Sequence, residues 1–290
     1  MYDFENPIED SICGVTHVIR TKEFEMREEL HRYILYLLDL RIPNIKEIGR
    51  YNIQGAITKG REIREMINNK KISGWDDPRL VTVKALKKRG FVPEMFKEVA
   101  KRAGLSKSGG NIDYSLLEAT NKQIIDSKTN RYFFIESPIT ITIKKAPEMN
   151  INIPLHPSFP EKGSREFNTK NIFYISEKDY EEIELSKNEN VRLMHLFNIK
   201  KKNKDFIYES TEFDKNLKAP IIHWLPGDNK NQAKLIPIEI VMPNNTKVYG
   251  KGEKDLIKLK KDEIIQFERF GFVKLNEIKD DKLIFYYTHN

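Results

Sequence analysis

The sequence has only one cysteine, Cys13, among its 290 residues. One cysteine excludes a disulfide within the chain and a zinc site built on cysteine ligands. The six histidines are scattered without metal-ligand spacing. No apolar stretch is long enough for a membrane span, and the acidic residues 1–10 lack the apolar segment of a signal peptide. We therefore expect a soluble protein of the cytoplasm without a dedicated metal site.

The chain carries an excess of positive charge. Its 50 lysines and arginines outnumber 43 acidic residues, for a net charge of +7. A basic balance favours a polyanionic partner, because phosphates attract these side chains and binding releases counterions. The alternative is a generally lysine-rich composition with solvated charges.

Hydrophobic patterning divides the chain near residues 80 and 136. Residues 14–20 predict a buried strand, and residues 24–40 predict a helix with apolar residues at helical spacing. Residues 80–135 predict three helices, with breaks at glycines and Asp113 as a cap. This block is dense in basic side chains, namely Lys84, Lys87, Lys88, Arg89, Lys97, Lys101, Arg102 and Lys107. They indicate either a surface for a phosphate backbone or a solvated face.

After residue 136 the apolar period changes to two. Short β-branched and aromatic runs, among them residues 139–145, 172–177, 205–210 and 233–242, alternate with polar turns. Many short strands without helices predict antiparallel sandwiches or barrels.

Residues 73–90, SGWDDPRLVTVKALKKRG, are the most specific segment. Pro78 fixes a turn before a helix, and the neighbouring aspartates either cap that helix or hold an arginine. The whole string resembles the GWDDPR signature of glutamyl- and glutaminyl-tRNA synthetases, which are class I enzymes. The residues that this resemblance implies for contact with the body of a tRNA are Trp75, Asp76, Asp77 and Arg79.

Residues 56–63, AITKGREI, resemble the KMSKS-type loop of the same family in altered form. Ala56 replaces the first lysine and Gly60 the last serine. The resemblance implies a role with ATP for Thr58, Lys59 and Arg61. A lysine at this place stabilises the phosphates as pyrophosphate leaves. From the residues alone, a solvated lysine loop is the simpler interpretation.

Residues 2–24 resemble the last strand region of the family's catalytic domain, written there as YDF…GITH…E. The resemblance implies that Tyr2, Arg20 and Phe24 contact the amino-acid substrate. Glutamyl enzymes have arginine at the position of Arg20, where glutaminyl enzymes have a small neutral residue. A guanidinium binds a carboxylate through bidentate, charge-assisted hydrogen bonds, whereas a glutamine amide would leave its charge unpaired. Residues 121–134, which end in NRYFF, also resemble glutamyl enzymes of archaeal type.

Three later segments resemble the anticodon-binding half of this family. They are residues 153–167, with HPSFPEKGSR, residues 219–226, with IHW, and residues 263–275, with QFERFG. Amide, carboxylate and guanidinium groups read splayed-out bases, and aromatic rings stack on them. The resemblance implies anticodon contacts for Arg165, Arg192, Gln266, Glu268 and Arg269. His156, His223 and Trp224 are interpreted as packing residues.

The resemblance covers the chain and implies a multidomain α+β fold. Residues 1–79 are expected to form the tail of a class I Rossmann-type catalytic domain, and residues 80–136 an α-helical stem-contact domain. Residues 137–290 are expected to form two antiparallel anticodon-binding β-barrels. The HIGH motif of the family's upstream half is absent, since no H-x-G-H occurs.

The implied function is therefore that of the carboxy-terminal half of a glutamate–tRNA ligase. With an amino-terminal half, as a heterodimer or larger assembly, it would attach glutamate to tRNA(Glu) with ATP, and Mg²⁺ would arrive with the ATP. Residues 1–50 are expected to pair with that half or to self-associate. A separately encoded half is favoured over a shortened chain by the first methionine. A tRNA-binding module without catalytic activity, a glutaminyl-tRNA synthetase half and a nondiscriminating enzyme remain as alternatives.

Overall fold

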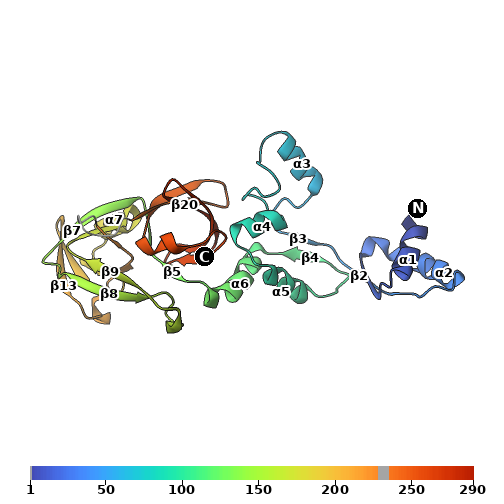
Figure 1. Ribbon diagram of the computed structural model, residues 1–290, viewed down its shortest axis with the longest axis horizontal. Helices are drawn as coiled ribbons and strands as arrows, with labels where there is room; N and C mark the ends of the chain where they lie inside the picture. Colours follow the sequence, from blue (N-terminus) through green and yellow to red (C-terminus); the bar gives the residue numbers. More distant parts are fainter. Residues whose placement is uncertain (1, 228–234) are drawn as a thin grey trace.

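The computed structural model describes residues 2–227 and 235–290, whose parts lie in a row along the long axis (Figure 1). The N-terminal module, residues 2–48, lies at one end. The helical block, residues 83–125, lies in the middle. A first sheet, from residues 138–226, lies at the far end. The chain then returns, and a second sheet, built mainly from residues 236–289, lies between the first sheet and the helical block.

The N-terminal module contains a small two-stranded sheet. Its elements are α1 (Tyr2–Ile12), β1 (His17–Thr21), the 3-10 helix η1 (Lys22–Arg27), α2 (Glu28–Leu37) and β2 (Asn44–Ile48). Within the described residues, β1 pairs only with β2, and the two strands are parallel. The expected strand is present, but its predicted burial is wrong, since Ile19 is 58% exposed. Within residues 2–24, which resemble the family's last strand region, helix α1 comes first and strand β1 follows it.

The predicted helix after β1 is confirmed as η1 followed by α2, but it turns apolar side chains to solvent. On α2 only His31 and Leu35 are buried. The exposed apolar residues of η1, α2 and the turn after it are Met26, Leu30, Tyr33, Tyr36, Leu37 and Leu38. A parallel sheet is normally covered on both faces. In this module, the side that carries these apolar residues is left uncovered by the described residues.

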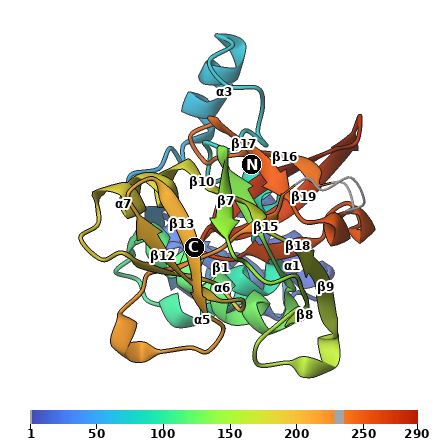
Figure 2. The same cartoon turned by 90° about the vertical axis from the view of Figure 1, so that its left-hand side faces the viewer.

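A short bridge joins the N-terminal module to the helical block. In it β3 (Tyr51–Ile53) pairs in parallel with β4 (Gly110–Ile112), a strand that the helical pattern did not predict. Between them in sequence, α3 (Gly60–Asn68) projects from the body in both overall views (Figures 1 and 2).

The helical block confirms the three predicted helices, α4 (Val83–Arg89), α5 (Pro93–Ala103) and α6 (Tyr114–Ile125). The Thr82 hydroxyl caps α4 by accepting a hydrogen bond from the Ala85 N–H. Asp113 caps α6 as predicted, through the Ser115 N–H. A small core that includes Leu86, Met95 and Leu117 holds the block together.

The first sheet has seven strands in the order β14-β11-β12-β13-β7-β10-β15. Their bounds are β7 (Pro138–Lys144), β10 (Ile172–Ser176), β11 (Asn190–Leu193), β12 (Asn198–Lys202), β13 (Asp205–Ser210), β14 (Ile221–Ile222) and β15 (Leu225–Pro226). A hairpin of β8 (Met149–Pro154) and β9 (Ser164–Thr169) packs nearby. The expectation of strands without helices is wrong here, because α7 (Glu177–Leu185) follows β10, capped by Ser176.

The second sheet also has seven strands, in the order β5-β18-β19-β20-β16-β17-β6. Their bounds are β5 (Arg131–Tyr132), β6 (Phe134–Glu136), β16 (Ile236–Val241), β17 (Lys247–Gly252), β18 (Ile264–Phe267), β19 (Gly271–Lys279) and β20 (Lys282–His289), with the 3-10 helix η5 (Lys254–Lys258) after β17. Residues 233 and 234 of the strand predicted at 233–242 lie outside the described residues.

The prediction of two antiparallel, closed barrels needs correction. Each sheet contains two parallel pairs, β11–β14 and β13–β7 in the first, and β16–β20 and β18–β5 in the second. The strand orders are linear, so each sheet is a curved half-barrel with two edges. A period of two shows which residues share a face, but it carries no information about which strands pair or in which direction.

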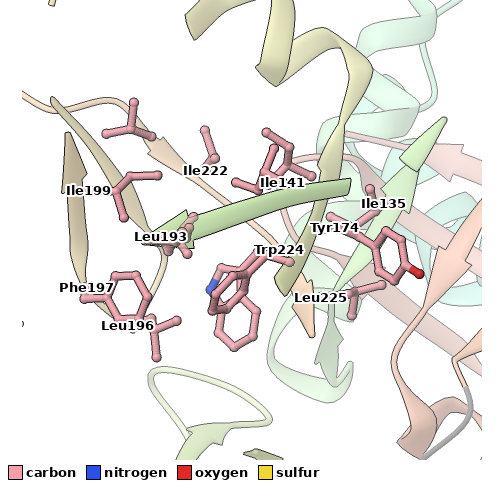
Figure 3. Packing of buried hydrophobic residues seen from close by; sticks show 14 of the residues in the cluster. Ile135, Ile141, Tyr174, Leu193, Leu196, Phe197, Ile199, Ile222, Trp224 and Leu225 are labelled. Carbon is pink, nitrogen blue, oxygen red and sulfur yellow. The ribbon is translucent and has the colours of Figure 1, made fainter. Parts of the chain in front are cut away.

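Each sheet has its own hydrophobic core. In the first, the indole of Trp224 is fully buried among residues such as Leu193, Ile135 and Leu225 (Figure 3). Its N–H donates to the Met194 carbonyl at 2.9 Å, so burial leaves no indole donor unpaired. The predicted packing roles of Trp224, His156 and His223 agree with their burial.

Candidate functional site

Three residues assigned to the amino-acid pocket gather in the N-terminal module. The ring centroids of Tyr2, on α1, and Phe24, on η1, lie 5.3 Å apart. The Tyr2 ring is also 6.1 Å from the ring of His31 on α2. Arg20, on β1, donates a hydrogen bond to the His31 Nδ1 atom. The structure therefore brings Tyr2, Arg20 and Phe24 together around one buried histidine.

The Arg20 side chain is 7% exposed and already has partners. Its Nη2 donates to Asn6 Oδ1 at 3.0 Å and to Asp10 Oδ2 at 3.4 Å. His31 in turn donates from Nε2 to Asp3 at 3.3 Å. These contacts hold the guanidinium in place.

The KMSKS-like loop lies apart from this cluster, at the start of the projecting helix α3 (Figure 1). Thr58, Lys59 and Arg61 are exposed. Lys59, the residue before α3, has its side chain 70% exposed and pairs with Glu62 at 3.1 Å. A surface ion pair of this kind contributes little stability, so the lysine is free to exchange partners.

The WDDPR segment folds into a turn whose hydrogen bonds converge on Asp77, here called the Asp77 turn. The buried Asp77 carboxylate accepts from the Ser73 N–H and hydroxyl and from the Arg79 N–H, Nε and Nη2, at 2.8 to 3.1 Å. The hydrogen bonds from Arg79 hold the pKa of Asp77 well below its usual range. Asp77 thus holds Arg79, one of its two predicted structural roles, while Thr82 caps the helix.

A basic groove of about 560 Å³ opens beside the Asp77 turn, between α4 and β19. Trp75, about one-third exposed, lies at its edge, and Asp76 pairs with Lys88 at 2.8 Å. Lys274 on β19 pairs with Asp262 at 2.8 Å. The residues that line the groove are Trp75, Asp76, Lys84, Lys87, Lys88, Asp262, Lys274 and Asn276. The groove thus carries a positive surface with an aromatic ring at its edge.

The residues assigned to the anticodon meet at the junction of the two sheets. Arg165, on β9, is 1% exposed and donates to Glu253 at 3.1 Å and to Glu268 at 2.8 Å. Its guanidinium also donates to the Arg131 carbonyl and lies 4.7 Å from the centre of the Phe133 ring. Burial raises the pKa of Glu253, which is the neighbour of Arg165 that is fully enclosed.

Unpaired polar atoms collect at this junction. Among the described residues, the buried side-chain atoms without a hydrogen-bond partner are Arg131 Nε, His156 Nε2, Arg165 Nε, Glu253 Oε1 and Gln266 Oε1. Gln266 lies beside Arg131 in the ladder of β18 with β5, and Arg165 donates to that same Arg131. Buried polar atoms are normally paired, so this concentration indicates a place for water or a polar ligand.

A second arginine cluster ties α7 to the turn between β18 and β19. Arg269 binds Asp179 with two hydrogen bonds, of 3.0 and 2.7 Å, and donates to His223 Nδ1 at 3.0 Å. Burial lowers the pKa of His223, with Arg269 adding to the effect. Sequence reasoning did not single out Asp179 or Glu253, because no local motif surrounds either of them.

Arg192, on β11, lies in the first sheet away from Gln266 and Arg269. It donates to Asn198 Oδ1 at 2.9 Å and to the Thr211 and Glu212 carbonyls, both at 3.3 Å. Its guanidinium lies 5.3 Å from the centre of the exposed Phe213 ring. The structure therefore brings four of the five predicted anticodon residues to the sheet junction and leaves Arg192 outside it.

The described residues show neither a metal-binding cluster nor a membrane-spanning helix. No group of three or more histidine, cysteine, aspartate or glutamate side chains there is arranged to hold a metal ion. None of the helices in residues 2–227 and 235–290 combines the length and apolar character needed to cross a membrane.

Three family profiles match the chain in succession. Residues 1–127 match "tRNA synthetases class I (E and Q), catalytic domain". Residues 129–216 and 221–276 match two profiles described as the anti-codon binding domain of the same enzymes. The end of a catalytic domain followed by two anticodon-binding regions defines a class I tRNA synthetase architecture. The chain belongs to the glutamate and glutamine (E and Q) family of class I tRNA synthetases, as its motifs predict.

Curated relatives agree with this assignment. The chain is 37% identical to the glutamate–tRNA ligase of Pyrococcus abyssi, over all of this chain and 51% of that protein. Identity to the glutamate–tRNA ligase of Methanosphaera stadtmanae is 34%, over all of this chain and 52% of that protein. For the ligase of Methanococcus maripaludis the identity is 35%, over 97% of this chain and 50% of that protein. The chain spans about half the length of the curated relatives that it matches.

Proposed function

We propose that this chain is the carboxy-terminal half of a glutamate–tRNA ligase. Together with an amino-terminal half, in the cytoplasm, it attaches glutamate to tRNA(Glu) with ATP. The observation that carries this proposal is the match of the whole chain to glutamate–tRNA ligases at 37% identity. We assign residues 1–79 to the catalytic domain, residues 80–136 to the stem-contact domain and residues 137–290 to the anticodon-binding region.

In this proposal, Arg20 binds the side-chain carboxylate of glutamate, and Tyr2 and Phe24 line the same pocket. The proposal is supported by their gathering around His31 and by the near-complete burial of Arg20. A glutamate carboxylate can replace Asp10, 3.4 Å away, as the charged partner of Arg20, whereas a neutral glutamine amide cannot. This argues against the glutaminyl alternative.

Lys59 supplies positive charge to the phosphates of ATP, with Thr58 and Arg61 beside it. Its exposure at the start of a projecting helix supports this role, because it can approach a nucleotide held by another part of the enzyme. Mg²⁺ accompanies the ATP.

The tRNA lies along the molecule from the basic groove to the sheet junction. Trp75, Asp76 and the lysines of the groove contact the body of the tRNA. The Asp77 turn, with its bound Arg79, shapes this surface. At the junction, the partly buried Gln266 has an unpaired side-chain oxygen that can accept from an anticodon base, and the buried Arg165 orients Glu268 beside it. Glu268 and Arg269 complete this site, and Arg192 contacts a neighbouring nucleotide.

The amino-terminal half covers the exposed apolar side of the N-terminal module. Monomeric proteins seldom leave such a cluster of large apolar side chains in water. This feature favours an assembled enzyme over a freestanding tRNA-binding module.

The test is aminoacylation of total tRNA with labelled glutamate, with this chain alone and with a separately expressed amino-terminal half. We expect activity only in the mixture. A verified complex that binds tRNA but transfers no glutamate would leave the tRNA-binding module as the function. Transfer of glutamine in place of glutamate would favour the glutaminyl enzyme.

A further inference from the structure

Arg89, predicted as one of the surface cations of the helical block, is instead 3% exposed. As the last residue of α4, it donates to the Tyr287 carbonyl at 3.1 Å and the Thr288 carbonyl at 2.8 Å. Its third donor reaches the Tyr114 hydroxyl of α6 at 2.8 Å. One guanidinium thus joins two helices to the end of β20, the last strand of the second sheet.

Residues at the end of β20 also bind groups of the two helices. The Thr288 hydroxyl donates to the Arg89 carbonyl. The buried Asn121 amide donates to His289 Nε2 at 2.9 Å and accepts from the Val92 N–H at 2.9 Å. Gly90, with φ of +105°, permits the close approach, since a Cβ there would lie 2.6 Å from the Thr288 hydroxyl. Among the described residues, Arg89 is the only cation whose side chain donates two hydrogen bonds to this strand.

This contact lies between the two places proposed to bind tRNA. On one side, α4 also carries Lys84, Lys87 and Lys88 of the basic groove. On the other side, β20 pairs with β19, with His289 opposite Phe272. β19 begins directly after the turn of Glu268 and Arg269. Arg89 is therefore one strand away from the turn that carries two of the proposed anticodon contacts.

We infer that Arg89 is a positioning residue that holds the helical block and the second sheet at a fixed spacing, so that one tRNA binds the groove and the sheet junction at once. This inference rests on the proposed tRNA-binding function. When two sites on one ligand are engaged together, the second contact is intramolecular, and its gain depends on the geometry between the sites. A loosened spacing weakens binding of the whole tRNA without changing either site.

The test uses the full chain and two RNAs, a tRNA(Glu) transcript and its isolated anticodon stem-loop. Arg89→Met removes all three hydrogen bonds and retains a long side chain, and Arg89→Lys keeps the charge. The control is Arg32→Met, which breaks an exposed pair with Glu28 in the N-terminal module. We expect Arg89→Met to weaken binding of the whole tRNA about tenfold, as lost simultaneous engagement implies. Stem-loop binding should stay within about twofold, Arg89→Lys should be intermediate and the control unchanged.

A protein-only readout accompanies the binding assay. Spin labels at Lys97, on α5, and Asp280, in the turn before β20, would be introduced into the Cys13→Ser protein, because Cys13 is its only and exposed thiol. We expect one narrow distance distribution in the parent and a broader one in Arg89→Met. Equal weakening of both RNAs, or no change for either with an unchanged distribution, would overturn the inference alone. Failure of the parent protein to bind either RNA would overturn the proposed function as well.

Discussion

At the scale of single residues, burial and hydrogen bonds keep the imidazole of His289 uncharged. Its ring accepts a hydrogen bond from Asn121, donates from Nδ1 to the Asn290 carbonyl at 3.0 Å and is therefore neutral. Burial lowers the pKa of His289 to about 4, with Lys122 and Arg89 adding repulsion against the charged form. The contact between β20 and the helices consequently depends on an uncharged imidazole.

The first prediction is a loss of stability on acidification. Below pH 6.5 the unfolded chain takes up a proton on this histidine, while the folded chain does not until about pH 4. The free energy of unfolding should therefore fall as the pH drops through this window, by about 2 kcal/mol at pH 5 from this residue. Urea denaturation at pH 7 and pH 5 measures it, with His289→Gln expected to show a smaller drop. An equal drop in both proteins would contradict the assignment.

Arg20 gives a second prediction at this scale. In the assembled enzyme, Arg20→Gln should raise the KM for glutamate about 100-fold, because the substrate carboxylate loses its charged partner. ATP–pyrophosphate exchange at varied glutamate concentration measures this, and thermal unfolding checks the fold, since Arg20 also contacts Asn6 and Asp10. A stable variant with an unchanged KM would remove Arg20 from the substrate pocket.

At the scale of elements, the WDDPR turn is stabilised by one carboxylate. Five donors converge on Asp77, so Asp77→Ala should lower the free energy of unfolding by about 3 kcal/mol through unpaired donors. Asp76→Ala is the matched control, because Asp76 is half-exposed and its charged partner is Lys88. It should cost less than about 1 kcal/mol. Urea unfolding of both variants provides the comparison. Similar losses in the free energy of unfolding would show that Asp77 is not what stabilises the turn.

The elements that the sequence predicted well are those with local signals. Helix α4 ends at Gly90 and helix α6 begins at Asp113, and both residues are capping signals that can be found in the sequence. Helix α7 was missed, because its window is charged and contains few apolar residues, although Ser176 was available as a cap. Strand β4 was missed because three residues of loop composition pair with β3, nearly 60 positions earlier in the chain by register.

At the scale of the whole molecule, the N-terminal module is the incomplete part. Ile19 on β1 and the apolar side of α2 face solvent, although parallel sheets are normally covered. We predict that binding an amino-terminal half will slow amide hydrogen exchange in residues 2–48, with little change in the two sheets. Mass spectrometry of the free and mixed proteins measures this.

The matched variant for that experiment is Leu37→Glu, which places a charge on the exposed apolar side without touching buried Leu35. It should weaken the association by tenfold or more, about 1.4 kcal/mol, and leave tRNA stem-loop binding intact. Strong protection of residues 2–48 in a monomeric free chain would contradict the prediction.

The sequence by itself determined the family, the capping positions Gly90 and Asp113 and the chemical types of the candidate site residues, because motifs and caps are local patterns. Only the tertiary structure decided which of those residues face outward. Arg165 matches the family's anticodon motif, yet it is buried between two carboxylates from distant segments. Arg89 looks like a surface cation, yet its partner Thr288 lies 199 positions away. Contacts between such distant positions, and the direction in which strands pair, leave no periodic trace in sequence, because they depend on how completed elements pack together.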